Sequence, residues 1–315
     1  MRPGPRREAR ARRQAVAVIV LLVAAAASTA LAVTGRLAAA QVVRPRMDGA
    51  AALRHVERLV AIGPRPAGSA GAARARAYIT GALKRWGVAA RVQAFDADTP
   101  HGRLKMANVI AVIPGKRPDV IVIAGHYDTK LFREFPFVGA NDGGSSAGLM
   151  LELARQLAGS TREYTVWIVF FDGEEARETW TATDSLYGSR HLAADLARRR
   201  ALPRAVIVAD MIGDRDLGIR REAESTGWLT DLVWGSAYRL GHGRHFLPDA
   251  IAVEDDHAPF LRRGVPATLL IDFEFPPWHT AQDTLATVSA QSLQTVGEVL
   301  LDALPAIEAR LGQGS

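Results

Sequence analysis

The sequence predicts a single α/β domain built on a twisted, mixed, mostly parallel sheet with helices on both faces. Apolar stretches rich in β-branched residues alternate along the chain with longer segments of helical periodicity. The hydrophobic share of 48% suits a sizeable core. No repeat, low-complexity tract or second domain interrupts residues 48–315, so this whole region is expected to form one domain.

The segment ahead of this domain has a different composition. Residues 1–14 are rich in arginine, 15–33 form an apolar run interrupted only by Ser28 and Thr29, and 34–47 form a linker. Basic residues ahead of an apolar run keep the N-terminus in the cytoplasm and direct the rest of the chain outward. The run suits either an uncleaved membrane anchor or a cleaved signal peptide. The domain is therefore expected to be extracytoplasmic, either membrane-anchored or exported.

The net charge of +6 belongs to this leader. Residues 1–40 carry seven arginines and one glutamate, which leaves 32 basic and 32 acidic residues for the rest of the chain. No basic patch alternates with aromatic residues in the domain, so the sequence does not support nucleic-acid binding. Because cysteine is absent, disulfides, thiolate metal ligands and a cysteine nucleophile are excluded.

The predicted elements begin with two helices. Apolar residues at helical spacing predict a helix over Asp48–Ile62, which ends at a loop rich in glycine and proline. Ser69 is placed to cap a second helix that runs to Trp86, with Gly87 just past its end. The next two strands are close together and therefore indicate an antiparallel edge. The first three strands are predicted at Val88–Phe95, Ala107–Ile113 and Val120–Ala124.

Helices and strands then alternate to the C-terminus. A glycine-rich entry leads into a predicted helix over Ala140–Leu157. The next strand, Val166–Phe171, is continuously apolar, as expected for a strand that is buried on both faces. The remaining strands are predicted at Ala205–Met211 and Ala267–Phe273. The remaining helices are predicted at Asp184–Arg198, Thr226–Leu240, Asp256–Arg263 and Ser289–Leu311.

Acidic and imidazole side chains follow the predicted strands. They are His126, Asp128, Asp142, Glu174, Glu175, Asp210 and His279. In open α/β sheets, ligands bind in the crevice beyond the carboxyl ends of the strands. Like charges brought together there need a cation between them, and Zn²⁺ takes nitrogen and oxygen ligands. The sequence therefore predicts a metal site in this crevice.

Individual residues in this set have structural explanations as well. Asp142 can simply cap the helix that follows it, and His279 can be a partly buried histidine without a metal. In the H-x-D arrangement, Asp128 is expected to accept the second ring N–H of His126 and so to orient the ring. The loop Lys130–Val138 and the segment Arg215–Glu224 are expected to shape the rim of the cleft.

The motifs GHYDT, GANDGGSSAG, FFDGEE, EDDHAPFLRRGVP and WHTAQDT together resemble the zinc-dependent aminopeptidase-like exopeptidases, and among them most of all the glutaminyl cyclases. The resemblance runs from Asp48 to the C-terminus, and its most distinctive pieces include DSLYGSRHLA at 184–193 and EDDHAPFLRRGVP at 254–266. It implies the zinc aminopeptidase-like fold and one bound zinc ion. It also implies an enzyme that converts the N-terminal glutamine of peptides or proteins into pyroglutamate and releases ammonia.

The resemblance further implies a role for each site residue. The implied zinc ligands are Asp142, Glu175 and His279. The implied general acid and base is Glu174. The implied acidic network around the substrate amine consists of Asp210 and Asp255. The implied walls of the pocket for the glutamine side chain are Trp180 and Trp278.

The turn GANDGGSSAG also fits a two-zinc aminopeptidase. Because His126 and Asp210 are available, a second metal ion could bind across Asp142 and activate water, with Glu174 as the base. The DSLYGSRH segment favours the cyclase over this alternative. A third hypothesis is a membrane-tethered binding protein without catalysis, but the retention of Glu174 and of the full ligand set argues against it.

Overall fold

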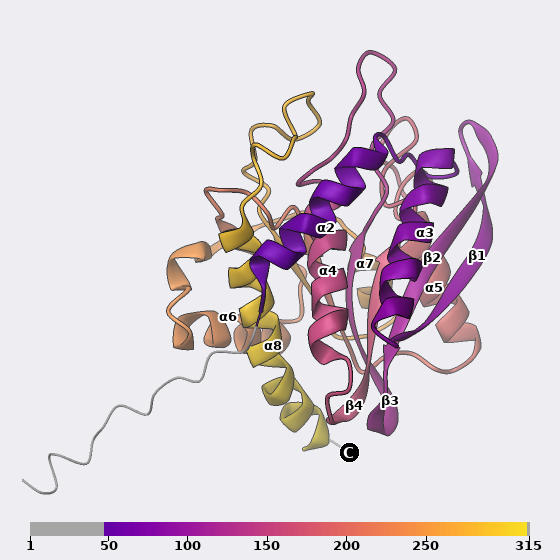
Figure 1. The fold of residues 1–315 in the computed structure, drawn as a ribbon. Helices are drawn as coiled ribbons and strands as arrows, with labels where there is room; N and C mark the ends of the chain where they lie inside the picture. The colour runs from indigo at the N-terminus through magenta and orange to yellow at the C-terminus, as the bar shows by residue number, and fades with distance from the viewer. Residues whose placement is uncertain (1–46, 314–315) are drawn as a thin grey trace, which may run out of the picture. The chain divides into compact units, whose positions relative to one another are not determined.

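The computed structural model describes residues 47–313, which form an eight-stranded sheet with helices on both faces (Figure 1). The strand order is β1-β2-β4-β3-β5-β8-β6-β7. Neighbouring strands at the centre of the sheet run parallel to one another. These are β4 (Arg162–Phe171), β3 (Gly115–His126), β5 (Ala205–Asp210) and β8 (Ala267–Ile271). The predicted α/β class with a mixed sheet is confirmed.

Antiparallel strands flank this parallel centre on both sides. On one side β2 (Gly102–Ile113) pairs with β4 and with β1 (Ala89–Thr99), as the close spacing of these strands predicted. On the other side β6 (Ile219–Glu222) pairs antiparallel with β8 and parallel with β7 (Phe246–Ile251). Strands β6 and β7 have no counterpart among the predicted elements. Their charged residues and Pro248 suit the sheet edge, but they hide the apolar pattern of a strand.

Helices cover the two faces of the sheet over two separate apolar cores. One face carries α2 (Gly49–Ile62), α3 (Ala70–Arg85), α4 (Gly144–Leu157), α6 (Gly227–Arg239) and α8 (Ala290–Gly312). The other face carries α5 (Tyr187–Arg198) and α7 (Ala258–Leu261). Successive side chains of β3 show the alternation, since Ile121 and Ile123 enter the first core, and Val122 and Ala124 enter the second.

The predicted starts of the first two helices are confirmed by their caps. The side chain of Asp48 accepts a hydrogen bond from the N–H of Ala51 at the start of α2. Ser69 accepts one from Ala72 at the start of α3. Gly87 follows α3 with a φ of +69°, the left-handed conformation that ends many helices.

Helix α4 begins at Gly144 rather than at Ala140, because Gly143 has a φ of +77° and interrupts the helical turn. A Cβ atom on Gly143 would lie 2.4 Å from the carbonyl oxygen of Asp128, so the backbone needs glycine here. No side chain caps α4, and the suggestion that Asp142 serves as a helix cap is therefore wrong.

Helix α5 also begins later than predicted, at Tyr187 rather than at Asp184. The carboxylate of Asp184 accepts hydrogen bonds from the backbone N–H groups of Arg177, Glu178 and Thr179 at 2.7, 2.9 and 3.1 Å. A carboxylate engaged in this way organises the loop ahead of the helix instead of extending the helix.

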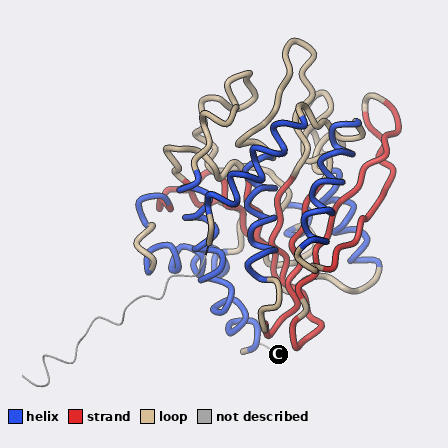
Figure 2. Tube along the Cα trace, viewed as in Figure 1, coloured by secondary structure: helices blue, strands red, loops and turns tan. Residues whose placement is uncertain are grey.

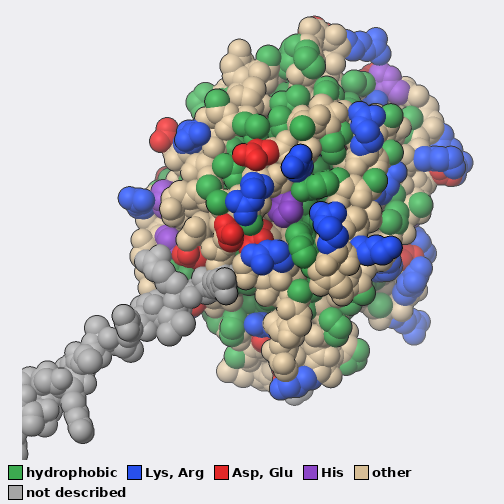
Figure 3. Space-filling view, viewed as in Figure 1, with side chains coloured by type: hydrophobic (Ala, Val, Ile, Leu, Met, Phe, Trp, Pro, Cys, Tyr) green, Lys and Arg blue, Asp and Glu red, His purple; other side chains and the backbone are tan. Residues whose placement is uncertain are grey.

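Long loops gather at the end of the sheet where the parallel strands stop, at the top of Figure 2. The helical face in Figure 3 exposes side chains of both signs, among which Lys and Arg predominate. The predictions for residues 1–46 lie outside the described residues. Within residues 47–313, none of the helices combines the length and the apolar composition that a bilayer crossing requires.

Candidate active site

A pocket of about 490 Å³ opens among these loops. Its lining includes the predicted cyclase residues Asp142, Glu174, Glu175, Trp180, Asp210, Asp255, Trp278 and His279. His126 and Asp128 are buried next to this set and do not line the pocket. The segment Arg215–Glu224, which was expected at the rim, does not line the pocket either. Most of it forms the loop before β6 and β6 itself.

Three of the lining residues form a compact cluster of ligand atoms. Nε2 of His279 lies 3.1 Å from Oε1 of Glu175 and 3.3 Å from Oδ2 of Asp142. One ligand atom from each residue lies within 4.8 Å of the others. Glu175 follows β4 and His279 follows β8, whereas Asp142 lies in the turn before α4. The fold thus brings together the three residues predicted as zinc ligands.

The chemistry of this cluster fits zinc. Two carboxylates and one imidazole are common zinc ligands, and three protein ligands leave a fourth position open for substrate. Oδ2 of Asp142 is buried and has no hydrogen-bond partner among residues 47–313. Burial and the charge of Asp142 raise the pKa of Glu175 to about 7. A cation between these carboxylates would stabilise their charged forms.

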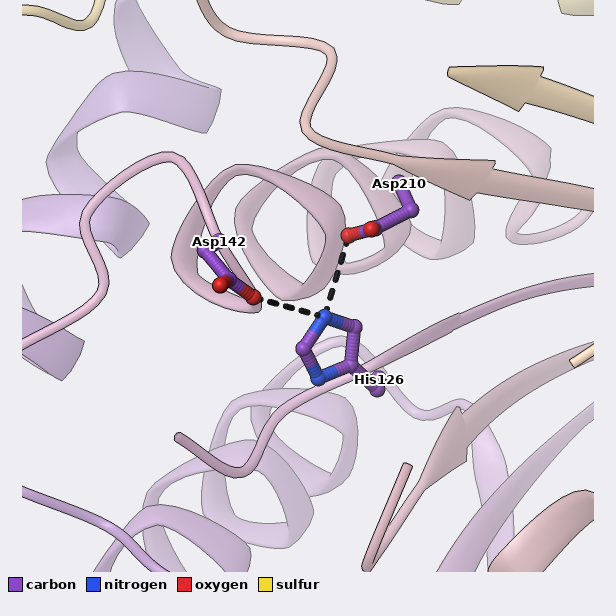
Figure 4. Close-up of side chains that lie close together, drawn as sticks. All are labelled: His126, Asp142 and Asp210. Atoms are coloured by element: carbon purple, nitrogen blue, oxygen red, sulfur yellow. Dashed lines mark hydrogen bonds and ion pairs between the residues drawn. The ribbon is translucent and has the colours of Figure 1, made fainter. Parts of the chain in front are cut away.

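A second cluster shares Asp142 with the first (Figure 4). Nε2 of His126 lies 3.0 Å from Oδ1 of Asp210 and 3.3 Å from Oδ1 of Asp142, and these three residues also meet the geometric requirement for a metal site. Although burial disfavours a charged ring, Asp210 and the other surrounding carboxylates raise the pKa of His126 well above its ordinary value. The imidazolium of His126 can therefore supply the positive charge that a second metal ion would supply.

Asp128 lies beside His126 as predicted, but at the distance of an ion pair rather than of a hydrogen bond. Its carboxylate lies 3.5 Å from Nδ1 of His126, and this ring nitrogen has no hydrogen-bond partner among the described residues. Asp128 accepts hydrogen bonds instead from the backbone N–H groups of Glu174 and Glu175, at 3.1 and 3.4 Å. Asp128 therefore fixes the turn that presents the two glutamates.

The carboxylates at the base of the pocket have perturbed acidities. Burial raises the pKa of Glu174 well above its ordinary value. Burial and the charge of Asp210 raise the pKa of Asp255 to about 7. Asp210 itself accepts a hydrogen bond from the hydroxyl of Ser146 at 3.1 Å. A carboxylate with a raised pKa binds a proton more strongly than an ordinary one, which suits a group that must accept and return protons.

Two tryptophans stand at the pocket, and each is 38% exposed. The ring of Trp278 stacks on the imidazole of His279 with a centroid distance of 4.2 Å. The indole N–H of Trp180 donates to the carboxylate of Glu254 at 3.2 Å. Packing into the apolar core does not account for side chains with this exposure.

Three charged residues around the ligands were not singled out as site residues, although the loop that begins at Lys130 was expected at the rim of the cleft. The fully buried Arg65 donates to the carbonyl oxygens of Val138 and Gly139, which shortly precede Asp142 in the chain. Lys130 lines the pocket, and its Nζ lies 3.8 Å from Oε2 of Glu175. The third residue, Asp283, accepts two backbone hydrogen bonds at the turn that carries Asp142. Asp283 lies inside the WHTAQDT motif, whereas Arg65 and Lys130 lie in loops outside the motifs named above.

A comparison with models of protein families identifies the family of this chain. The model of peptidase family M28 matches residues 108–304. The chain belongs to peptidase family M28. The glutaminyl-peptide cyclotransferase of Bos taurus is 30% identical to this M28 chain over 288 residues, covering 74% of the chain and 75% of the relative.

Solved structures agree with this relationship. A glutaminyl cyclase from an Acidobacteriales bacterium is 43% identical to this M28 chain, with a TM-score of 0.81, and covers 87% of this chain and 99% of its own. A leucine aminopeptidase precursor from Bacteroides thetaiotaomicron, 24% identical with a TM-score of 0.76, covers 84% of this chain and 98% of its own and shares the fold. Within the M28 family, the chain groups with the glutaminyl cyclases.

Proposed function

We propose that this M28 enzyme converts the N-terminal glutaminyl residue of peptides and proteins into pyroglutamate and releases ammonia. The observation that carries the proposal is a single pocket in which a buried Glu174 stands beside the cluster of Asp142, Glu175 and His279. The similarity to glutaminyl-peptide cyclotransferases supports the same activity.

The reaction needs no water. The α-amine of the substrate attacks its own γ-carboxamide carbon, so that a new C–N bond closes a five-membered lactam. The bond from this carbon to the amide nitrogen then breaks, and the nitrogen leaves as ammonia. One proton has to move from the attacking amine to the leaving nitrogen, which defines the task of a general acid and base.

Glu174 is the residue that we assign to this proton transfer. Burial raises its pKa, so its carboxylate is a stronger base than an exposed glutamate. Its carboxylate takes the proton from the amine as the ring closes and returns it to the leaving nitrogen. Asp210 and Asp255 line the same pocket, and we assign them to hydrogen bonds that hold the substrate amine.

Asp142, Glu175 and His279 would hold the zinc ion. Bound there, zinc supplies Lewis-acid polarisation of the γ-carbonyl group. Trp180 and Trp278 would enclose the glutamine side chain, which keeps the amine close to the carbonyl and limits the access of water. Exclusion of water favours cyclisation over hydrolysis of the same amide.

The direct test offers the purified protein two peptides that differ only in an N-terminal glutamine or leucine. We expect ammonia from the first peptide without chain cleavage, and no free leucine from the second. Release of leucine would support the two-zinc aminopeptidase, which the comparisons do not favour. Metal content gives a second measurement, with one zinc ion per chain expected for the cyclase and two for the aminopeptidase.

We further propose that the domain works outside the cytoplasm. The support is the arginine-rich segment 1–14 followed by the apolar run 15–33. A phosphatase reporter that is active only outside the cytoplasm, fused after the domain, tests the topology, and inactivity of the fusion would contradict it. The mass of the mature chain distinguishes a cleaved signal from a retained anchor.

A further inference from the structure

Three aromatic rings surround the imidazole of His279. Trp278 stacks on it, and Phe132 and Phe137 meet it edge-on, with centroid distances of 5.7 and 5.9 Å and interplanar angles of 72° and 89°. Phe132 also contacts Phe137 at 5.4 Å. The ring of His279 therefore packs against a connected group of aromatic side chains while its Nε2 faces Asp142 and Glu175.

These aromatic contacts matter because the Nδ1 side of the ring has no hydrogen bond to hold it within residues 47–313. A metal-binding histidine usually donates its second ring N–H to a carboxylate, a carbonyl group or a water molecule, and a protein acceptor fixes the orientation of the ring. Within residues 47–313, no group accepts a hydrogen bond from Nδ1 of His279. The backbone of His279 also has a φ of +55°, a conformation that non-glycine residues adopt at a cost in free energy.

The loop that supplies the two phenylalanines reaches all three residues of the cluster. Lys130 at its start donates to the carbonyl oxygen of Ala176 at 2.8 Å and lies 3.8 Å from Glu175. Phe132 and Phe137 contact His279, and the chain then continues directly into the turn that carries Asp142. This single loop thus links the three candidate ligands.

We propose that Phe132 and Phe137 are positioning residues that hold the imidazole of His279 in the orientation required for zinc binding. The inference rests on the proposed function, because it assumes that His279 is a zinc ligand. Aromatic packing takes the place of the missing hydrogen bond on Nδ1. Removal of either ring should leave the ligand set intact but let the imidazole rotate away from Asp142 and Glu175.

The experiment measures zinc affinity, independently of activity, by competition with a chelator of known affinity. Phe132→Leu and Phe137→Leu should each weaken zinc binding about tenfold, the size of effect expected when a group that orients a metal ligand is removed. Phe132 is only partly buried, so its variant should fold, and the melting temperature of the metal-free protein checks this. Phe132→Tyr keeps the aromatic ring and should restore wild-type affinity. The absorption spectrum of Co²⁺-loaded protein should change in the leucine variants only.

Phe95→Leu is the matched control. Phe95 stacks on His191 with a centroid distance of 4.4 Å, and both residues line a different surface groove. Its zinc affinity should equal that of the wild type. Wild-type affinity in both loop variants, or an equal loss in Phe95→Leu, would overturn the inference while leaving the proposed function intact. A wild-type protein that binds no zinc would instead overturn the metal assignment in the proposed function, and this inference with it.

Discussion

The carboxylate of Asp283 accepts a hydrogen bond from the backbone N–H of Asp142 at 3.0 Å. The same carboxylate accepts a second bond, at 2.7 Å, from the N–H of Asn141. Asp283 lies four residues after His279, so the loop that carries one candidate ligand also fixes the turn that carries another. Two of the three candidate zinc ligands are therefore tied together by the protein itself.

Asp283→Ala should weaken both the fold and the metal site. The substitution leaves two buried N–H groups without an acceptor, which should lower the free energy of unfolding by about 1–3 kcal/mol for each group. Zinc affinity should fall about tenfold, because Asp142 is no longer held in place. Urea denaturation and chelator competition measure the two effects. The exposed Asp98 provides the control, since Asp98→Ala should change neither quantity.

Glu174→Gln should reduce turnover strongly and leave zinc bound. The amide has nearly the same shape but cannot accept the proton, so we expect kcat to fall by about 10²–10⁴. Ammonia release and metal content are measured on the same sample. The exposed Glu178 lies on the same loop, and Glu178→Gln should retain wild-type turnover. Near-wild-type activity of Glu174→Gln would remove its assignment as acid and base.

His279→Ala should lose zinc, because it removes one of three protein ligands and the only nitrogen among them. Metal content after dialysis should fall to background, and cyclisation should fall with it. His191→Ala removes a histidine outside the pocket and should keep its zinc. Full zinc occupancy in His279→Ala would show that the ion lies elsewhere.

Stability should depend on pH through His55. Burial lowers the pKa of His55 to about 4, and its Nδ1 makes a 2.6 Å hydrogen bond with the hydroxyl of Tyr78. Below about pH 6.5 the unfolded chain binds a proton on this ring, whereas the folded chain does not. The free energy of unfolding therefore falls as the pH falls from 6.5 towards 4. The loss should be roughly 1–2 kcal/mol once solvent screening of this partly exposed ring is included.

Urea denaturation of wild-type protein and His55→Gln at several pH values isolates this effect, because titration of the other groups is common to both proteins. The wild type should lose more stability than the variant as the pH falls through this window. Parallel stability curves would show that His55 does not titrate differently in the folded and unfolded chains.

The central sheet and the candidate ligands could be predicted from the sequence because their signals are local. Each of β3, β4, β5 and β8 contains an apolar run towards its C-terminal end, and a run of this kind indicates where its strand ends. The polar residues after these stops then share one end of a parallel sheet. From this rule alone, the sequence predicts that His126, Glu175 and Asp210 lie close together.

The parts that the sequence did not predict depend on contacts between distant loops. The bond from Asp283 to Asp142 and the packing of Phe132 on His279 leave no periodic pattern. The hydrogen bonds of Asp128 followed the turn at Glu174 rather than its neighbour His126, because backbone N–H groups of that turn face the carboxylate. Tertiary geometry decided each of these cases.

The tight approach of Gly143 to Asp128 has a consequence for recognising distant homologues. Even a methyl group at position 143 would require the peptide plane of Asp128 to move, since the gap to its oxygen is only 2.4 Å. A chain that kept every acid and imidazole but carried alanine here would need a rearranged cavity. Sequence searches for working enzymes of this type should therefore weigh the residue after Asp142 as heavily as Asp142 itself.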